Sequence, residues 1–185
     1  LKEILQNNQN TNWAALSAVQ FAPVIPNPSK IICVGLNYKT HTSEFDMAIP
    51  EEPVLFNKYS NALAAHQQTI PISSYASKLD YEAELVIIMG RICKNVSVDE
   101  AAAYISGYTI GNDLSERDYQ FRSSQWMIGK TWDSFAPVGP WCITADSLSL
   151  EDLSIRCYVN GELRQQASTK DMIFTCSEII SYISK

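Results

Sequence analysis

The alternation of apolar and polar residues predicts a chain that is mainly β-strand. Residues 79–90, LDYEAELVIIMG, end in an apolar run and a glycine, which is typical of a strand that stops at a turn. Side chains alternate between the two faces of a strand, so Asp80, Glu82 and Glu84 are expected on one face. The second half of this segment is apolar on both faces, which predicts a strand covered on both sides.

Other segments add short strands and a few helices. Strands are predicted at residues 30–34, 53–58, 108–113, 153–159 and 162–166. Helices are predicted at residues 98–105, 115–122 and 176–183. The Asn-Gly pair at 160–161 predicts a tight hairpin. Two capping boxes, Ser97 with Glu100 and Thr175 with Glu178, predict helix N-termini, so the fold class expected is α+β, mainly β.

Prolines suggest a division of the chain near its beginning. Pro23, Pro26 and Pro28 each fix φ and disfavour helix before them, which indicates an extended linker. We therefore expect residues 1–28 to be an N-terminal appendage with a linker. Residues 29–185 are expected to form one domain, because a chain of 185 residues that is 46% hydrophobic can bury a single core.

Composition limits the classes of partner. A formal net charge of −6 and the lack of a Lys/Arg run argue against nucleic acid. No apolar run reaches the ~20 residues of a membrane span, so no membrane partner is expected. Five cysteines, an odd number without a CxxC pair, indicate reduced core thiols. The location expected is the cytoplasm, with the mitochondrial matrix as an alternative.

Carboxylates from two segments make the first candidate site. Asp113 ends a strand that one helix separates from the acidic strand, and such strands are often neighbours, so Asp113 would approach Glu82 and Glu84. Ligands with oxygen donors only suit Mg²⁺, Mn²⁺ or Ca²⁺. The alternatives are a solvated strand face for the glutamates and a turn or helix-cap role for Asp113.

Three residues outside this cluster can support acid–base or electrostatic chemistry. His41 and Glu44 are spaced i, i+3, so both would lie on one face of a helical turn, where the carboxylate could orient the imidazole. A solvated surface pair is the alternative. Lys130 follows a glycine between aromatic and apolar residues, and it is either a surface residue with an amphipathic stem or a cation that faces the acids.

Five ordered blocks of sequence resemble the fumarylacetoacetate hydrolase family. They are KIICVGLNYKTHTSE at 30–44, EEPVLFNK at 51–58, LDYEAELVIIMG at 79–90, GYTIGNDLSERDYQ at 107–120 and QWMIGKTWDSFAPVGP at 125–140. The resemblance implies a mixed β-roll of the type found in the C-terminal domain of that family, commonly assembled as a homodimer. The chain ends before the PGD…TGTP segment that usually completes this fold, so the roll is expected to be incomplete at its C-terminus.

The resemblance also implies roles for individual residues. Glu82, Glu84 and Asp113 resemble the ligands of Mg²⁺ or Mn²⁺, and His41 with Glu44 resembles the dyad that activates water. Lys130 and Gln120 resemble groups that contact the substrate or its oxyanion. Arg117 follows Asp113 on the same predicted helix as Gln120, and that place makes it a further candidate for substrate binding. A surface ion pair with the neighbouring Asp118 is the alternative for Arg117.

The activity implied by the resemblance is metal-dependent cleavage of a C–C bond in a small 2-oxo acid, such as an acylpyruvate. In that reaction the metal stabilises an enolate. The same site could instead serve an oxaloacetate-type decarboxylase or a 2-oxo acid isomerase or tautomerase. An alternative of another class is a metal-binding homodimer without catalytic activity.

Overall fold

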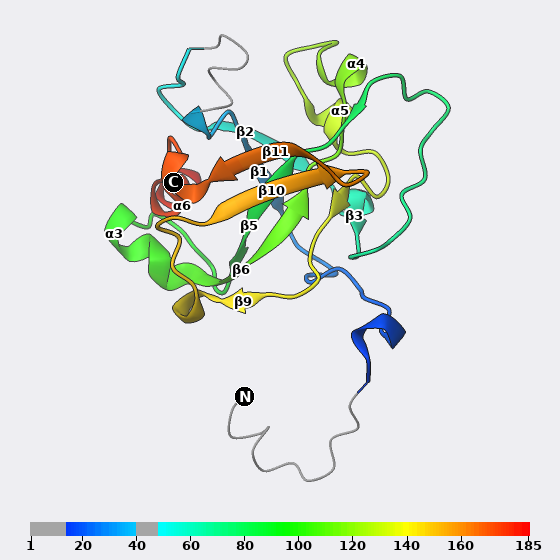
Figure 1. Ribbon diagram of the computed structural model, residues 1–185. Helices are drawn as coiled ribbons and strands as arrows, with labels where there is room; N and C mark the ends of the chain where they lie inside the picture. Colours follow the sequence, from blue (N-terminus) through cyan, green and yellow to red (C-terminus); the bar gives the residue numbers. More distant parts are fainter. Residues whose placement is uncertain (1–13, 40–47) are drawn as a thin grey trace.

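Paired strands make up most of the regular structure in the computed structural model, which describes residues 14–39 and 48–185 (Figure 1). The strands are β1 (Ile31–Gly35), β2 (Val54–Lys58), β3 (Leu63–Ala64), β4 (Leu79–Asp80), β5 (Ala83–Met89), β6 (Ile105–Asn112), β7 (Ser115–Glu116), β8 (Ala136–Pro137), β9 (Ile143–Thr144), β10 (Ser154–Val159) and β11 (Glu162–Ser168). The α-helices are α3 (Val98–Ala101), α4 (Arg117–Gln120), α5 (Met127–Lys130) and α6 (Cys176–Ile183). The 3₁₀ turns are η1 (Leu16–Ala18), η2 (Ser60–Ala62), η3 (Ala102–Tyr104), η4 (Ala145–Ser147) and η5 (Thr169–Asp171). This mixture confirms the α+β, mainly β, fold class.

A three-stranded antiparallel sheet, β5–β6–β9, lies at the centre of the described chain. The β10–β11 hairpin crosses in front of β5 and β6, and β10 contacts β5 (Figure 1). The remaining strands form pairs: β1 with β2, β4 with β7 and, in parallel, β3 with β8. The β-roll and its incompleteness at the C-terminus remain predictions.

The segment 79–90 is not one strand, so that prediction was wrong. β4 pairs with β7, whereas β5 pairs with β6, and the chain changes partner at Tyr81–Glu82. The Asp80 side chain accepts a hydrogen bond of 2.9 Å from the Tyr81 amide at this break. The side chains of β5 are half-buried from Ala83 to Ile88, and Met89 is exposed, so the strand is not fully covered on both sides as predicted.

The helices begin where the capping boxes predict, but two of them are shorter than expected. Glu100 accepts bonds from the amide and hydroxyl of Ser97, and Glu178 does the same for Thr175. α3 passes into the η3 turn and then into β6, so the helix predicted over 98–105 ends early. In the predicted helix 115–122, the first two residues form β7 instead, because they pair with β4.

Helix α3 packs against α6 over a small apolar core. Val96, Ala101 and Ile180 are buried there, and Ile87 and Cys93 pack against them. The five cysteines are all free, as their spacing predicts. Cys142 is exposed, however, so the expectation of core thiols was wrong for that residue. It lies on an exposed stretch before β9.

The β10–β11 hairpin confirms the prediction from its Asn-Gly turn. Both turn residues have positive φ, 52° for Asn160 and 83° for Gly161, which is what a tight hairpin of this handedness requires. The register shifts between Cys157, which pairs with Gln165, and Tyr158, which pairs with Leu163. The strand β11 therefore carries a β-bulge of one residue next to Gln165.

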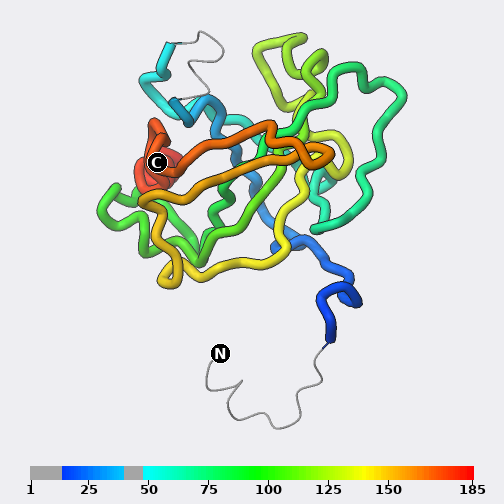
Figure 2. The backbone as a smooth tube through the Cα atoms, in the orientation of Figure 1, coloured from blue at the N-terminus to red at the C-terminus, as the bar shows by residue number. Residues whose placement is uncertain are grey.

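The first described residues, around the η1 turn, extend away from the sheets (Figure 2). None of the η1 residues is buried. The division of the chain at residue 28 remains a prediction. Among the described residues, no helix has both the length and the apolar character needed to cross a membrane.

Candidate metal and substrate site

Three carboxylates converge where β5 begins and β6 ends. One oxygen from each of Glu82, Glu84 and Asp113 lies within 4.8 Å of the others. The antiparallel pairing of β5 with β6 brings them together, and the Asp113 amide donates a hydrogen bond of 2.8 Å to the Glu82 carbonyl. The predicted convergence is therefore present. Asp113 is 3% exposed, and the two glutamates are half-buried, so the solvated alternative does not describe this cluster.

Lys130 faces the carboxylates. Its ammonium donates to Glu82 Oε2 and to Asp113 Oδ2, each at 2.8 Å, and the residue is 1% exposed. Of the two alternatives for this lysine, the structure has the buried cation. Gly129 makes the position of Lys130 possible, because a Cβ at residue 129 would lie 2.3 Å from the backbone nitrogen of Gln120. Only a residue without a side chain lets α5 approach α4 so closely.

Lys58, at the end of β2, is a second buried cation beside the acids. It is 3% exposed, and its ammonium lies 2.6 Å from Asp113 Oδ1. The same group donates to the carbonyl oxygens of Leu114 at 3.0 Å and Phe135 at 2.9 Å, and also to the Lys130 carbonyl. Lys58 was not among the site residues predicted from the sequence. Lys58 falls on the same strand face as Phe56, and that alternation is the signal that could have revealed it.

Arg117 joins the cluster from the opposite side. Its guanidinium donates to Asp80 Oδ2 at 2.6 and 2.9 Å, to Glu82 Oε1 at 2.7 Å and to Gln120 Oε1 at 2.8 Å. The alternative of a surface pair with Asp118 was wrong, because Asp118 pairs with Lys78 instead. Arg117 and the buried Gln120 thus lie at the site, and contact between them and a substrate remains a prediction.

The pKa values of the two glutamates shift in opposite directions. Burial raises the pKa of Glu82, but Lys130 and Arg117 outweigh it and lower that pKa to about 2. Burial and the charges of Asp113 and Glu82 raise the pKa of Glu84 well above its usual value. Burial lowers the pKa of Lys130, but the adjacent carboxylates of Asp113 and Glu82 hold it above its usual value. Lys130 is therefore positively charged at neutral pH.

The donor atoms fit a hard divalent cation. Asp113 Oδ1 is buried and accepts no hydrogen bond within the described residues, but it forms an ion pair of 2.6 Å with the Lys58 ammonium. One oxygen from each of Glu82, Glu84 and Asp113 lies close enough to the others for the three to share one ion. A set of three carboxylates suits Mg²⁺ or Mn²⁺ better than zinc.

The predicted dyad of His41 and Glu44 lies outside the described residues. The turn that leads to it is described as far as Lys39. Asn37 is buried and holds this turn to the 172–174 segment, because its side chain donates to the Phe174 carbonyl at 3.0 Å and accepts from the Phe174 amide at 2.8 Å. Burial and the Glu84 charge raise the pKa of Tyr38 to about 12.

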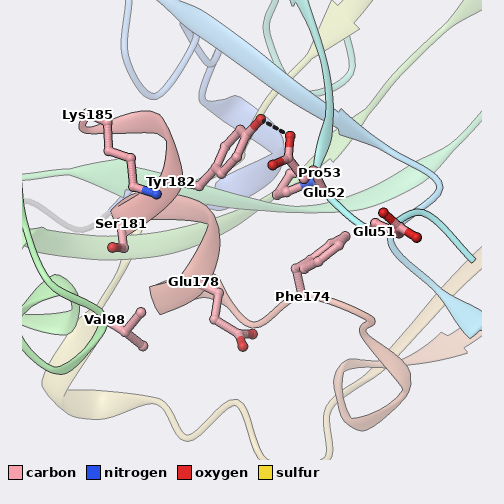
Figure 3. Close-up of a pocket in the computed structure, with 9 residues that line it drawn as sticks. All are labelled: Glu51, Glu52, Pro53, Val98, Phe174, Glu178, Ser181, Tyr182 and Lys185. Carbon is pink, nitrogen blue, oxygen red and sulfur yellow. Dashed lines mark hydrogen bonds between the residues drawn. The ribbon is translucent and has the colours of Figure 1, made fainter.

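A separate groove lies against α6 (Figure 3). It encloses about 240 Å³ and shares no lining residue with the carboxylate cluster. Two of the acids around it already have partners, since Glu52 accepts a hydrogen bond from the Tyr182 hydroxyl and Glu178 caps the helix. The carboxylate cluster, with three convergent acids beside two buried lysines, is the stronger candidate for a functional site.

Comparisons with known proteins place this site in a family context. A sequence profile described as fumarylacetoacetate (FAA) hydrolase C-terminal matches residues 30–185. A fumarylacetoacetate hydrolase domain-containing protein 2 homolog from Dictyostelium discoideum is 45% identical over 89% of this chain and 57% of that protein. A mitochondrial oxaloacetate tautomerase from Xenopus laevis is 37% identical over 100% of this chain and 58% of that protein.

Solved structures agree with the sequence comparisons. The structure of 5-carboxymethyl-2-hydroxymuconate delta-isomerase from Mycobacterium smegmatis is similar with a TM-score of 0.77 and 40% identity, over 84% of this chain and 61% of that one. This chain thus spans less than two thirds of the length of each of these relatives. The profile match covers most of the chain and the identities exceed 30%, so the chain belongs to the fumarylacetoacetate hydrolase family.

Proposed function

We propose that this chain carries the metal site of a tautomerase or isomerase that acts on a small 2-oxo acid. The observation that carries the proposal is the convergence of three carboxylates beside the buried ammonium of Lys130. Relatives named as an oxaloacetate tautomerase and a muconate isomerase favour this alternative over the C–C hydrolase first expected from the sequence. Both reactions share the requirement for a stabilised enolate.

Glu82, Glu84 and Asp113 would hold the divalent cation, Mg²⁺ or Mn²⁺. When bound, such a cation polarises the carboxylate and keto oxygens of a 2-oxo acid and thereby favours the enolate. The buried Lys130 and the half-buried Arg117 keep Glu82 ionised and oriented before the cation arrives. Glu82 is thus held in place by its neighbours rather than by the metal.

Lys130 would stabilise the charge that develops on the substrate. Tautomerisation removes a proton from the carbon next to the keto group, and negative charge builds on the keto oxygen. A buried, protonated lysine such as Lys130 stabilises such an oxygen more than it would in bulk solvent. We assign the proton transfer at carbon to His41, with Glu44 orienting the imidazole, as their spacing predicts.

The test is a direct measurement of keto–enol interconversion of oxaloacetate by the intact protein. The ultraviolet absorbance of the enol is followed with Mg²⁺ present and again after chelation by EDTA. Pyruvate formation is measured in parallel to detect decarboxylation, and loss of an acylpyruvate to detect C–C hydrolysis. We expect metal-dependent interconversion that is faster than either of the other reactions.

Two variants make the test specific. Glu84→Gln removes a ligand charge and should reduce both Mn²⁺ affinity and interconversion. Glu162→Gln alters a glutamate that pairs with Arg164 on the exposed face of β11, and it should change neither. Equal activity in Glu84→Gln and the wild type would refute the metal site. Metal-dependent cleavage of an acylpyruvate without interconversion would instead restore the hydrolase assignment.

Two further expectations are proposals of the same kind. We expect a homodimer, as the family resemblance implies, and size-exclusion chromatography with light scattering tests it. We keep the mitochondrial matrix beside the cytoplasm as a location, because relatives such as the Xenopus laevis protein are named as mitochondrial.

A further inference from the structure

The backbone between the two glutamates has an unusual partner. Ala83 separates Glu82 from Glu84, and its amide donates a hydrogen bond of 2.7 Å to Gln165 Oε1. The Gln165 amide nitrogen donates in return to the Ala83 carbonyl at 3.1 Å. A single side chain therefore makes both of the hydrogen bonds that a neighbouring strand would otherwise supply.

The other edge of this segment is held by the end of β6. The Glu82 amide donates to Asn112 Oδ1 at 3.1 Å, and the Glu82 carbonyl accepts from the Asp113 amide at 2.8 Å. The residues that carry the acidic side chains are thus clamped between β6 and Gln165. Because neighbouring carboxylates repel each other, the segment needs such restraint to keep both acids directed at one point.

The β-bulge explains how Gln165 reaches this position. The register shift leaves Arg164 without a partner on β10, so β11 turns locally at Gln165. Gln165 is half-buried, whereas its neighbours Arg164 and Gln166 are exposed. Bulges commonly redirect a side chain next to a functional site, and this one directs Gln165 at the chain between Glu82 and Glu84.

We propose that Gln165 is a positioning residue, which fixes the Glu82-Ala83-Glu84 segment so that its two carboxylates meet Asp113 in a geometry that binds a divalent cation. The proposal rests on the proposed function in one respect, namely that these three residues are the metal ligands. It adds a role for a hairpin that contributes no ligand of its own. Residues that orient metal ligands typically change affinity by about 10- to 100-fold when they are replaced.

The experiment compares Gln165→Met with Gln166→Met in the intact protein. Methionine keeps the length of the side chain but removes the amide, and Gln166 is the matched control because it is the exposed neighbour on the same strand. Isothermal titration with Mn²⁺ measures affinity. We expect Gln165→Met to raise the Kd about 10- to 100-fold and Gln166→Met to leave it unchanged.

Hydrogen exchange at the Ala83 amide, measured by NMR in metal-free protein, provides a readout that does not depend on metal or activity. Exchange should accelerate in Gln165→Met and stay unchanged in Gln166→Met. Faster exchange with an unaltered Kd would overturn the positioning role, because the hydrogen bonds would then be structural only. An unaltered exchange rate would overturn it as well.

Two outcomes would require a second variant or a different interpretation. If Gln165→Met does not fold, Gln165→Asn is used instead, since its amide is one methylene too short to reach Ala83, and the same two readouts decide. A wild-type protein that binds no Mn²⁺ would overturn the proposed function, and with it the metal-positioning role. The exchange rate of Ala83 would then still show whether Gln165 restrains the segment.

Discussion

Replacement of Lys58 by methionine should destabilise the fold more than any exposed lysine substitution. Methionine fills much of the same space but removes the ammonium that lies 2.6 Å from Asp113 Oδ1. The carbonyl oxygens of Leu114, Lys130 and Phe135 lose the same donor. These groups belong to three separate segments, so one substitution loosens the contacts among them all.

The expected loss in the free energy of unfolding follows from the burial of this ion pair. Removing one partner of a buried ion pair costs about 3–5 kcal/mol, because the other charge is left without compensation. Asp113 keeps Lys130 as a partner, which limits the electrostatic loss, but the carbonyls that lose a charged donor are buried around it. A loss of about 4 kcal/mol is a large share of the ~5–15 kcal/mol that stabilises a typical domain.

Urea unfolding followed by tryptophan fluorescence measures this loss. With a slope of about 2 kcal/mol per molar urea, the midpoint should fall by about 2 M. Lys78→Met is the matched control, since Lys78 also pairs with an aspartate, at 2.7 Å, but its side chain is 67% exposed. Its midpoint should hardly change. A Lys58→Met midpoint no lower than that of the control would refute the structural role of this ammonium.

Three further predictions concern local features. Gly129→Ala should lower kcat by about 100-fold with little change in the circular dichroism spectrum, because a Cβ there would lie 2.3 Å from the Gln120 nitrogen and would displace α5 together with Lys130; an unchanged kcat would contradict this. Thr175→Ala should lower the free energy of unfolding by about 1 kcal/mol, since its hydroxyl caps α6, and a thermal scan in which Tm stays constant would argue against the cap. The Thr175 amide and hydroxyl lower the pKa of Glu178 below its ordinary 4.5. The ionised carboxylate therefore stabilises the folded state at pH values above 4.5, and this contribution disappears as the pH falls through the folded-state pKa. The stability difference between wild type and Glu178→Gln should therefore be largest near neutral pH and vanish in acid; a difference independent of pH would contradict the sign.

Local features of the fold could be predicted from the sequence because they depend on residues close together in the chain. The Asn160-Gly161 turn and both capping boxes involve contacts across three residues or fewer. The convergence of Glu82, Glu84 and Asp113 required one longer step, the pairing of two consecutive strands. The break between β4 and β5 could not be predicted, because it depends on which distant strands compete for the same segment.

The residues that contact the carboxylates or their backbone could not be predicted from the sequence for the same reason. Lys58 contacts Phe135 across 77 residues, and Gln165 contacts Ala83 across 82. No periodicity connects such positions. Arg117 was predicted from its place after Asp113. Its ion pairs with Asp80 and Glu82 were not predicted, because they depend on the pairing of β4 with β7.

The alternation of side chains along a strand provides a more selective sequence criterion for buried lysines. A lysine with an apolar neighbour two residues away on the same strand face must bury its stem, and its ammonium then requires an anion in the interior. Lys58 satisfies this criterion through Phe56, and Phe56 also lies beneath the other buried lysine, with Lys130 Nζ 5.1 Å from its ring centre. The inward-facing cation on β2 and the acids at the start of β5 and the end of β6 therefore imply each other. Searching for both together is more selective than searching for the acidic triplet alone, because a solvated acidic strand has no need of buried lysines.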